Sequence, residues 1–246
     1  MTHVDLFSGI GGFALAARWC GIETVQFVEI DPFCQKVLNK NFPGVPIHDD
    51  IKTYKGGGTS PFLLTGGFPC QDISLAGRGV GLSGERSGLW SEYDRIISEV
   101  RPKFIIVENS AGLLVRGLDR VLCDLSKNGY DAEWQVISAK EAGAPHKRER
   151  LYVIAYSNGE HGKARLGIIK NGEGKIFPLR LRERFPVWLQ AADQFIGMDD
   201  GLPARLYKDR VRSIGNSIVP QIAYQIMKAI LEAENMISSQ RSRHDY

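Results

Sequence analysis

The stretch that decides the fold is HVDLFSGIGGFALAARWC, residues 3–20. Its first five residues are typical of a short buried strand, SGIGG is a glycine-rich turn, and the remainder has the apolar spacing of a helix that Gly21 would end. A strand–turn–helix unit of this kind directs helix N–H groups toward a ligand and lets the backbone approach it closely. The glycines lack the G-x-G-x-x-G spacing of dinucleotide-binding turns, which disfavours a nicotinamide dinucleotide.

Strand-like and helix-like patterns continue to alternate through residue 156. Further strands are expected at 24–30, 61–67, 103–109, 132–138 and 150–156, and helices at 32–42, at 87–100 and in the dozen residues that end at Gly129. Two of the apolar runs, 61–67 and 103–109, are short enough to be central parallel strands. The alternation predicts a doubly wound α/β sheet that binds its ligands at the carboxyl ends of the strands.

The alternation stops near Ser157, where the composition changes. Between Ser157 and Arg184 there are seven basic and three acidic residues, a net charge of +4, so the rest of the chain sums to −1. This pattern fits a polyanion-binding patch and a solvated loop equally well. A last amphipathic helix is expected at about 219–235, before a frayed polar tail. We therefore expect a catalytic domain of residues 1–156 and 210–246, and a small irregular domain of residues 157–209.

The composition limits the class of protein. Of the 246 residues, 43% are hydrophobic and 24% charged, as in globular domains. No apolar run approaches the roughly 18 residues that cross a bilayer, and the N-terminus does not resemble a signal peptide. The four cysteines are far apart and form no C-x-x-C pair, which argues against a zinc site and disulfides and favours a reducing cytoplasm. We expect a cytoplasmic protein with neither a metal nor a membrane partner.

Two acidic residues follow the early strands, where a nucleoside would lie. Glu29 ends the second expected strand, where a carboxylate can accept hydrogen bonds from both hydroxyls of a ribose. Asp50 lies beyond the next segment and is suited to an amine donor such as the amino group of adenine. Together with the glycine-rich turn, they describe a nucleoside site without a phosphate clamp, which S-adenosylmethionine would satisfy.

A candidate nucleophile follows the strand at 61–67. In GGFPCQDIS, residues 66–74, Pro69 restrains the approach to Cys70 and the two glycines leave room for a second ligand. A cysteine needs thiolate character to attack, which nearby cations or a helix N-terminus provide. The other three cysteines lie in helical patterns and are interpreted as structural thiols: Cys20, Cys34 and Cys123.

Charged residues at the next two strands complete the candidate site. Glu108 ends the strand at 103–109, beside Cys70, and burial there would raise its pKa and let it donate a proton to a ring nitrogen. Arg148 and Arg150 flank Glu149 and would share one face of the following strand. Their guanidinium groups could bind phosphate, orient Glu108 or hold the thiolate.

These motifs resemble those of a known family. DLFSGIGGF, EIDPF, GGFPCQDIS, VENS, HKRERLYVIA and GNSIVPQIA occur in the order seen in DNA (cytosine-5) methyltransferases, over nearly all of residues 1–156 and 210–234. The resemblance implies a Rossmann-like S-adenosylmethionine-dependent methyltransferase sheet. It also implies that carbon 5 of cytosine is methylated in a specific double-stranded DNA sequence, on a flipped-out base. We expect the protein to act as a monomer.

The resemblance also implies residue roles. Cys70 would be the nucleophile, Glu108 would contact the cytosine ring nitrogen, and Arg148 and Arg150 would support the active site. The residues implied to line the S-adenosylmethionine site are Phe7, Gly9, Gly11, Glu29, Asp50, Pro69 and Asn216. The chain departs from the family at His146, where glutamine is usual, and in the shortness of its expected target-recognition domain, 157–209.

Three alternatives remain at this point. One is an RNA cytosine methyltransferase, because some members of the family act on transfer RNA. A non-catalytic DNA-binding relative is disfavoured by the intact set of candidate residues, and a nicotinamide dehydrogenase by the glycine spacing. The recognised sequence is not predicted, nor is the setting, whether restriction–modification, an orphan enzyme or phage protection.

Overall fold

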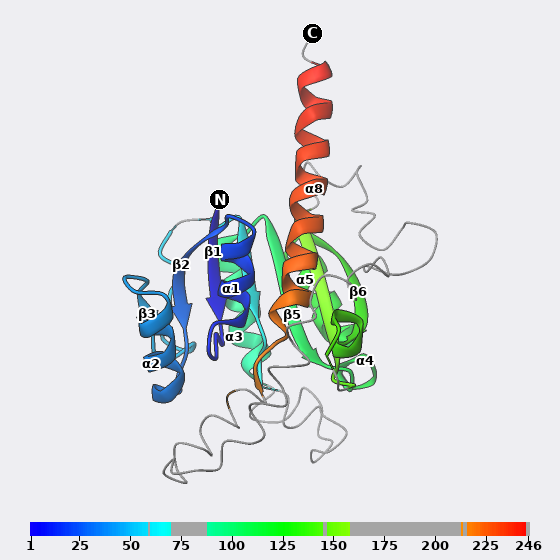
Figure 1. Ribbon diagram of the computed structural model, residues 1–246. Coiled ribbons are helices and arrows are strands. Elements are labelled where there is room, and N and C mark those ends of the chain that lie inside the picture. Colours follow the sequence, from blue (N-terminus) through cyan, green and yellow to red (C-terminus); the bar gives the residue numbers. More distant parts are fainter. Residues whose placement is uncertain (59, 70–87, 145–146, 158–212, 214–215, 245–246) are drawn as a thin grey trace.

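The computed structural model describes residues 1–58, 60–69, 88–144, 147–157, 213 and 216–244, the last nine of these as backbone only (Figure 1). Seven strands form one sheet in the order β3-β2-β1-β4-β5-β7-β6. The strands are β1 (Thr2–Leu6), β2 (Glu23–Val28), β3 (Ile47–His48), β4 (Leu63–Gly66), β5 (Phe104–Ser110), β6 (Tyr130–Ser138) and β7 (Glu149–Ser157). β1 to β5 pair in parallel, and the strand order reverses between β1 and β4. The predicted doubly wound α/β sheet is confirmed.

Helices cover both faces of this sheet (Figure 1). They are α1 (Gly12–Trp19), α2 (Pro32–Asn41), α3 (Leu89–Val100), α4 (Leu113–Arg116), α5 (Leu118–Lys127), the 3-10 helix η2 (Ala139–Ala142) and α8 (Pro220–His244). On one face the apolar sides of α3 and α5 pack on β1, β4, β5 and β7, with Trp90 and Tyr93 among the largest buried side chains. On the other face α1 and α8 pack together over β5 and β7. None of these helices, within the described part of the chain, could cross a bilayer.

The structure differs from the sequence-based expectation at several elements, among them the short helices α4 and η2, which were not expected. β3 has only two residues, too few for a periodic signal, and was not expected. α8 continues to His244, past the expected end near residue 235, because residues 236–244 contain no glycine or proline to stop it. β7 is antiparallel to both neighbours, since the ten residues between β6 and β7 are too few for a crossover helix that would make them parallel.

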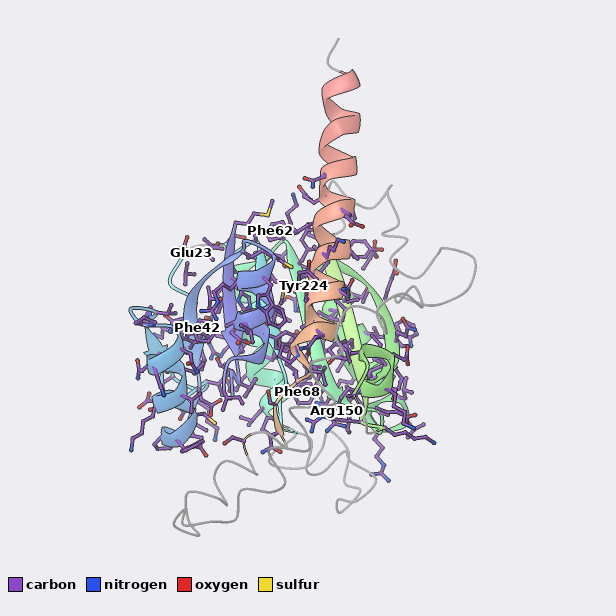
Figure 2. The ribbon with its side chains drawn as sticks, viewed as in Figure 1. Glu23, Phe42, Phe62, Phe68, Arg150 and Tyr224 are labelled. Carbon is purple, nitrogen blue, oxygen red and sulfur yellow. The ribbon has the colours of Figure 1, made fainter. Side chains whose placement is uncertain are left out.

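The carboxyl ends of the parallel strands form one edge of the sheet. Figure 2 shows Phe68, which follows β4, and Arg150, which is near the start of β7, close together at this edge. Glu23 and Phe62, which are at the beginnings of β2 and β4, lie at the opposite edge. The antiparallel direction of β7 therefore brings Arg150 to the edge formed by the carboxyl ends of the parallel strands.

A chain of buried hydrogen bonds links three neighbouring strands within the sheet. The Thr65 hydroxyl on β4 donates to Asp5 Oδ1 on β1 at 2.8 Å, and His3 Nε2 lies 2.8 Å from the same hydroxyl oxygen. Because this hydroxyl has one proton, His3 Nε2 must donate to it, and Nδ1 then accepts from Thr24 Oγ1 on β2 at 2.9 Å. Burial lowers the pKa of His3 to about 3, so the ring is neutral.

This network predicts that Thr65→Val destabilises the protein by about 2 kcal/mol or more. Valine keeps the shape but leaves both Asp5 and His3 without the partner they have in the core, where neither side chain is exposed. Urea unfolding would measure the loss. Thr24→Val is the matched variant and should cost less, because Thr24 is only half-buried and water can replace it. Equal stability of Thr65→Val and the wild type would contradict the prediction.

Candidate functional site

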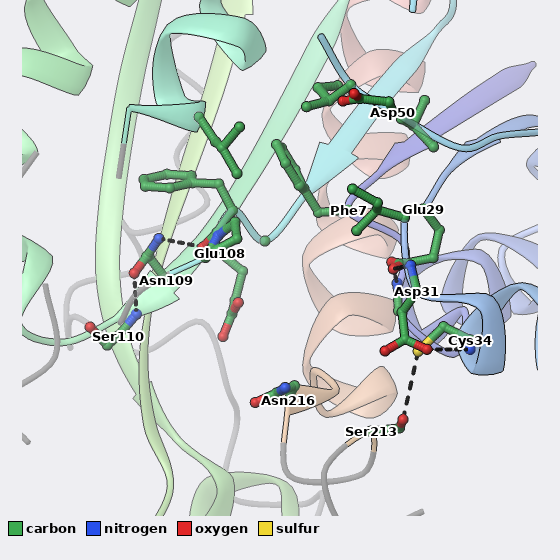
Figure 3. Close-up of a pocket in the computed structure, with 18 of the residues that line it drawn as sticks. Phe7, Glu29, Asp31, Cys34, Asp50, Glu108, Asn109, Ser110, Ser213 and Asn216 are labelled. Carbon is green, nitrogen blue, oxygen red and sulfur yellow. Dashed lines mark hydrogen bonds between the residues drawn. The ribbon is translucent and has the colours of Figure 1, made fainter. Parts of the chain in front are cut away.

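A cavity of about 580 Å³ opens at the carboxyl ends of the strands, beside the reversal of strand order between β1 and β4. Figure 3 shows Glu108 and Asn216 entering it from one side and Glu29 and Asp31 from the other. Its lining comes from segments far apart in the sequence. The residues that line it are Phe7, Gly9, Val28, Glu29, Ile30, Asp31, Cys34, Asp50, Ile51, Lys52, Gly67, Phe68, Pro69, Leu89, Glu108, Asn109, Ser110, Arg148, Arg150, Ser213 and Asn216.

Glu29 follows β2 and is held in place by two backbone amides. Its Oε2 accepts a hydrogen bond from Gly9 N at 2.6 Å, and its Oε1 accepts one from Asp31 N at 2.8 Å. Burial raises the pKa of Glu29, and the two amides oppose this rise because they favour the ionised form. Each carboxylate oxygen retains a second lone pair that can accept a hydrogen bond from a ligand.

Two apolar side chains give the same part of the cavity a surface for a flat ring. The Ile30 side chain is 72% exposed although it is large and apolar. Phe7 begins the glycine-rich turn with φ 52 and its ring stacks on Tyr93 with the centroids 6.2 Å apart. Exposed apolar groups beside a fixed carboxylate are typical of small-molecule sites.

Glu108 provides the buried carboxyl group on the opposite side of the cavity. Its Oε1 lies 3.0 Å from Arg150 Nε across the β5–β7 pair, and the side chain is 9% exposed. Burial raises the pKa of Glu108, whereas Arg150 and Arg148 act to lower it. A carboxyl group with a raised pKa can donate a proton as well as accept one, so this position suits general acid chemistry.

The strand ends around Glu108 are joined by short contacts. Asn109 Nδ2 donates to the carbonyl of Phe68 at 3.1 Å, which connects the end of β5 to the chain just after β4. Arg148 Nη2 donates to the carbonyl of Ser217 at 2.7 Å. This second bond brings the chain that precedes α8 to the cavity, where Asn216 contributes an exposed side chain.

Most residues that the sequence singled out lie together. Nine line the cavity: Phe7, Gly9, Glu29, Asp50, Pro69, Glu108, Arg148, Arg150 and Asn216. Gly11 does not line it; it is the N-cap of α1, against Leu38 and Phe42. Cys70 and His146 lie outside the described residues, as does nearly all of the expected domain at 157–209.

Sequence reasoning missed several residues of the cavity. Ile30 and Asp31 directly follow Glu29 at the end of an expected strand, which was the available signal, whereas Lys52 had no such signal because β3 before it was not expected. Cys34, interpreted as a structural thiol, is 6% exposed and also lines the cavity, with its Sγ 3.6 Å from Ser213 Oγ. Among the residues that the structure describes, no cluster of three or more His, Cys, Asp or Glu side chains could hold a metal ion.

Comparison with known proteins links this geometry to one family. The model of the family of C-5 cytosine-specific DNA methylases matches residues 1–185. The Type II methyltransferase M2.BsuMI of Bacillus subtilis (strain 168) is 38% identical over 163 residues, 63% of this chain and 42% of that protein. The Type II methyltransferase M.HhaI of Haemophilus parahaemolyticus is 33% identical over 162 residues, 64% and 50% of the two chains. The chain spans about half the length of the relatives it matches.

Solved structures share the fold. The S. pombe Dnmt2 methyltransferase is similar with a TM-score of 0.54 and 23% identity, over 64% of this chain and 50% of that one. The Entamoeba histolytica methyltransferase EhMeth has a TM-score of 0.67 and 16% identity, over 94% and 98% of the two chains. At identities below 25%, this structural similarity shows only that the fold is shared.

The buried Glu108 predicts a pH-dependent stability. Because its pKa is raised in the folded state, its contribution to stability is full below its usual value of 4.5 and is lost as the pH rises through the raised value. Glutamine does not titrate. We therefore expect the free energy of unfolding of Glu108→Gln to increase relative to that of the wild type as the pH rises from 4.5 through the raised pKa of Glu108, measured by urea unfolding.

The control for this measurement is Glu23→Gln, which removes an exposed carboxylate from the beginning of β2. A difference between Glu108→Gln and the wild type that stays constant, or shrinks, as the pH rises would contradict the role assigned to burial.

Proposed function

The chain belongs to the family of C-5 cytosine-specific DNA methylases, and we propose that it transfers a methyl group from S-adenosylmethionine to carbon 5 of cytosine in a specific double-stranded DNA sequence. The observation that carries the proposal is the pair of Glu108 and Arg150 at the edge of a cavity that also contains Pro69. Cys70 follows Pro69 directly in the sequence, and Pro69 lines this cavity together with Glu108.

The cavity residues fit S-adenosylmethionine. The free lone pairs of the Glu29 carboxylate suit the two hydroxyls of a ribose, because both oxygens are fixed by Gly9 and Asp31. Phe7 and Ile30 offer apolar contact to the adenine ring, and Asp50 suits its amino group. When bound, S-adenosylmethionine supplies an electrophilic methyl group on a sulfonium. Gly11 is part of the turn that shapes this site rather than of its surface.

A second group of residues would activate the target cytosine. Carbon 5 of cytosine is a weak nucleophile, so we assign to the Cys70 thiolate the addition to carbon 6. Glu108, whose pKa is raised by burial, would donate a proton to ring nitrogen 3, and carbon 5 then has the electron density to accept a methyl group. Loss of the carbon 5 proton to a base and departure of the thiolate restore the aromatic ring, with the proton on nitrogen 3 returned to Glu108.

The two arginines would prepare these groups. Arg150 holds the Glu108 carboxyl at 3.0 Å, and Arg148 contributes a second positive charge to the same position. Positive charge also favours a cysteine in its thiolate form. Their opposing effect on the pKa of Glu108 limits its rise, so this carboxyl group can both release a proton and recover it.

The DNA substrate imposes a further requirement. Carbon 5 of a stacked base is inaccessible to these groups, so the target cytosine would have to leave the duplex, at a cost of a few kcal/mol. We assign recognition of the sequence to residues 157–209, whose basic segment suits phosphates, and catalysis to residues 1–156 and 210–246. The proposed setting is the cytoplasm of a bacterial or phage-infected cell, with the protein acting as a monomer.

The proposal predicts that Cys70→Ser loses methyl transfer and still binds S-adenosylmethionine, because serine cannot provide a comparable nucleophile. Transfer of tritiated methyl groups to mixed-sequence duplex DNA measures the first property, and calorimetry measures the second.

DNA that contains 5-fluorocytosine should trap a covalent adduct with the wild type alone, since fluorine cannot leave as a proton. Turnover by Cys70→Ser at the wild-type rate would refute the mechanism. Methylation of transfer RNA instead of DNA would show that the substrate is RNA.

A second prediction concerns Gly67. A Cβ at this position would lie 2.8 Å from Glu108 Oε2, so Gly67→Ala should displace the carboxyl group while leaving the backbone of the fold undisturbed. We expect kcat to fall about a hundredfold or more, the scale of general acid catalysis. The control is the same substitution in Glu108→Gln: an equal further loss there would show that Gly67→Ala does not act through Glu108.

A further inference from the structure

Arg95, on α3, does not line the cavity, yet it holds a segment that does. We propose that Arg95 is a positioning residue for S-adenosylmethionine: it fixes the turn of residues 50–54, which presents Asp50, Ile51 and Lys52 to the cavity. The inference rests on the proposed function and adds to it a residue that governs affinity for the methyl donor without touching it.

The Arg95 guanidinium makes four contacts that bridge α3 and this turn. Nη2 donates to the carbonyl of Ile51 at 2.9 Å and to that of Tyr54 at 3.0 Å. On its own helix, Nε lies 2.8 Å from Glu92 and Nη1 lies 2.6 Å from Glu99. The two carboxylates hold the planar group in one orientation, so its remaining donors point at the turn.

The turn itself is tightly closed. The carbonyl of Asp50 accepts hydrogen bonds from the amides of Thr53 at 3.1 Å and Tyr54 at 3.0 Å. The Asp50 side chain accepts from Lys52 N at 2.9 Å. This arrangement leaves the carbonyls of Ile51 and Tyr54 outside the internal bonds of the turn, and Arg95 bonds to both of them.

The turn is therefore fixed at both ends relative to Glu29. At its beginning, the carbonyl of His48 accepts from Glu29 N at 2.9 Å, where β3 pairs with β2. At its end, the bonds from Arg95 fix it to α3. The distance between the carboxylates of Glu29 and Asp50, which are proposed to bind ribose and adenine, consequently depends on Arg95.

A purely structural role would have a different signature. Ile51 and Tyr54 are 6% and 8% exposed and belong to the apolar core beneath α3, so they keep the turn on the protein when Arg95 is changed. The Arg95 side chain itself is 32% exposed and is not part of that apolar core. We therefore expect substitution of Arg95 to make the position of the turn less well defined, without disrupting the fold.

The experiment measures S-adenosylmethionine binding by calorimetry and steady-state methylation of duplex DNA. Arg95→Ala should raise both the Kd and the KM for S-adenosylmethionine about tenfold, with kcat at saturation and the KM for DNA within about twofold of the wild type. Arg95→Lys should recover part of the affinity, since one ammonium cannot keep both carbonyl bonds and both carboxylates. The matched control is Arg120→Ala, which removes a similar helix ion pair, Arg120 with Asp124 on α5, away from the site.

A double-mutant cycle with Asp50→Ala tests the route of the effect. If Arg95 acts through the turn, Arg95→Ala costs little further affinity once the Asp50 carboxylate is absent. Additive losses would overturn the inference, as would a lower kcat with an unchanged KM, which marks a smaller active fraction. If Arg95→Ala fails to fold, Arg95→Lys decides by the same measurements. A wild type that does not bind S-adenosylmethionine would instead refute the proposed function itself.

Discussion

The contact between Glu108 and Arg150 depends on a single feature of the topology, the reversed direction of β7. The two side chains meet at 3.0 Å across an antiparallel strand pair in which Glu108 is opposite Tyr152 and Ser110 is opposite Arg150. A parallel β7 would place its beginning, and both arginines with it, at the far edge of the sheet. Glu108 would then be a buried carboxyl group without a cation, which is far more costly than a paired one. The rest of the cavity is assembled around this pair.

Three buried carboxyl groups lie near this edge, and each has a different partner. Glu29 accepts two backbone amides, Glu108 has two guanidinium groups, and Asp5 accepts from the hydroxyl of Thr65. Burial raises the pKa of all three, and the charge of Glu29 raises that of Asp5 further. The backbone amides cannot move, so Glu29 serves as a fixed acceptor. The arginine side chains can respond to a change of charge, which suits Glu108 to gaining and losing a proton.

The sequence was sufficient to predict most of the elements and the edge at which the cavity lies, because both follow from local patterns. Strand-like runs ended at Glu29 and Glu108, and parallel strands bring such ends together. The contacts of Arg95 with the carbonyls of Ile51 and Tyr54 could not be predicted, since they join residues more than forty positions apart and leave no periodic trace. The direction of β7 could in principle have been predicted from the sequence, because ten residues between β6 and β7 cannot contain a crossover helix.

The chain that precedes α8 is held at the cavity by a hydrogen bond at this same edge of the sheet. Arg148 precedes β7 and donates to the carbonyl of Ser217, so it ties the start of the α8 region to the strand that carries Arg150. α8 then packs against α1, the helix that follows the glycine-rich turn. The first and last helices of the described chain therefore pack together, and the segments that precede them contribute Gly9 and Asn216 to the cavity. β7 itself ends at the opposite edge of the sheet, where Ser157 N donates to the carbonyl of Lys103, whereas Ser213 lies at the cavity.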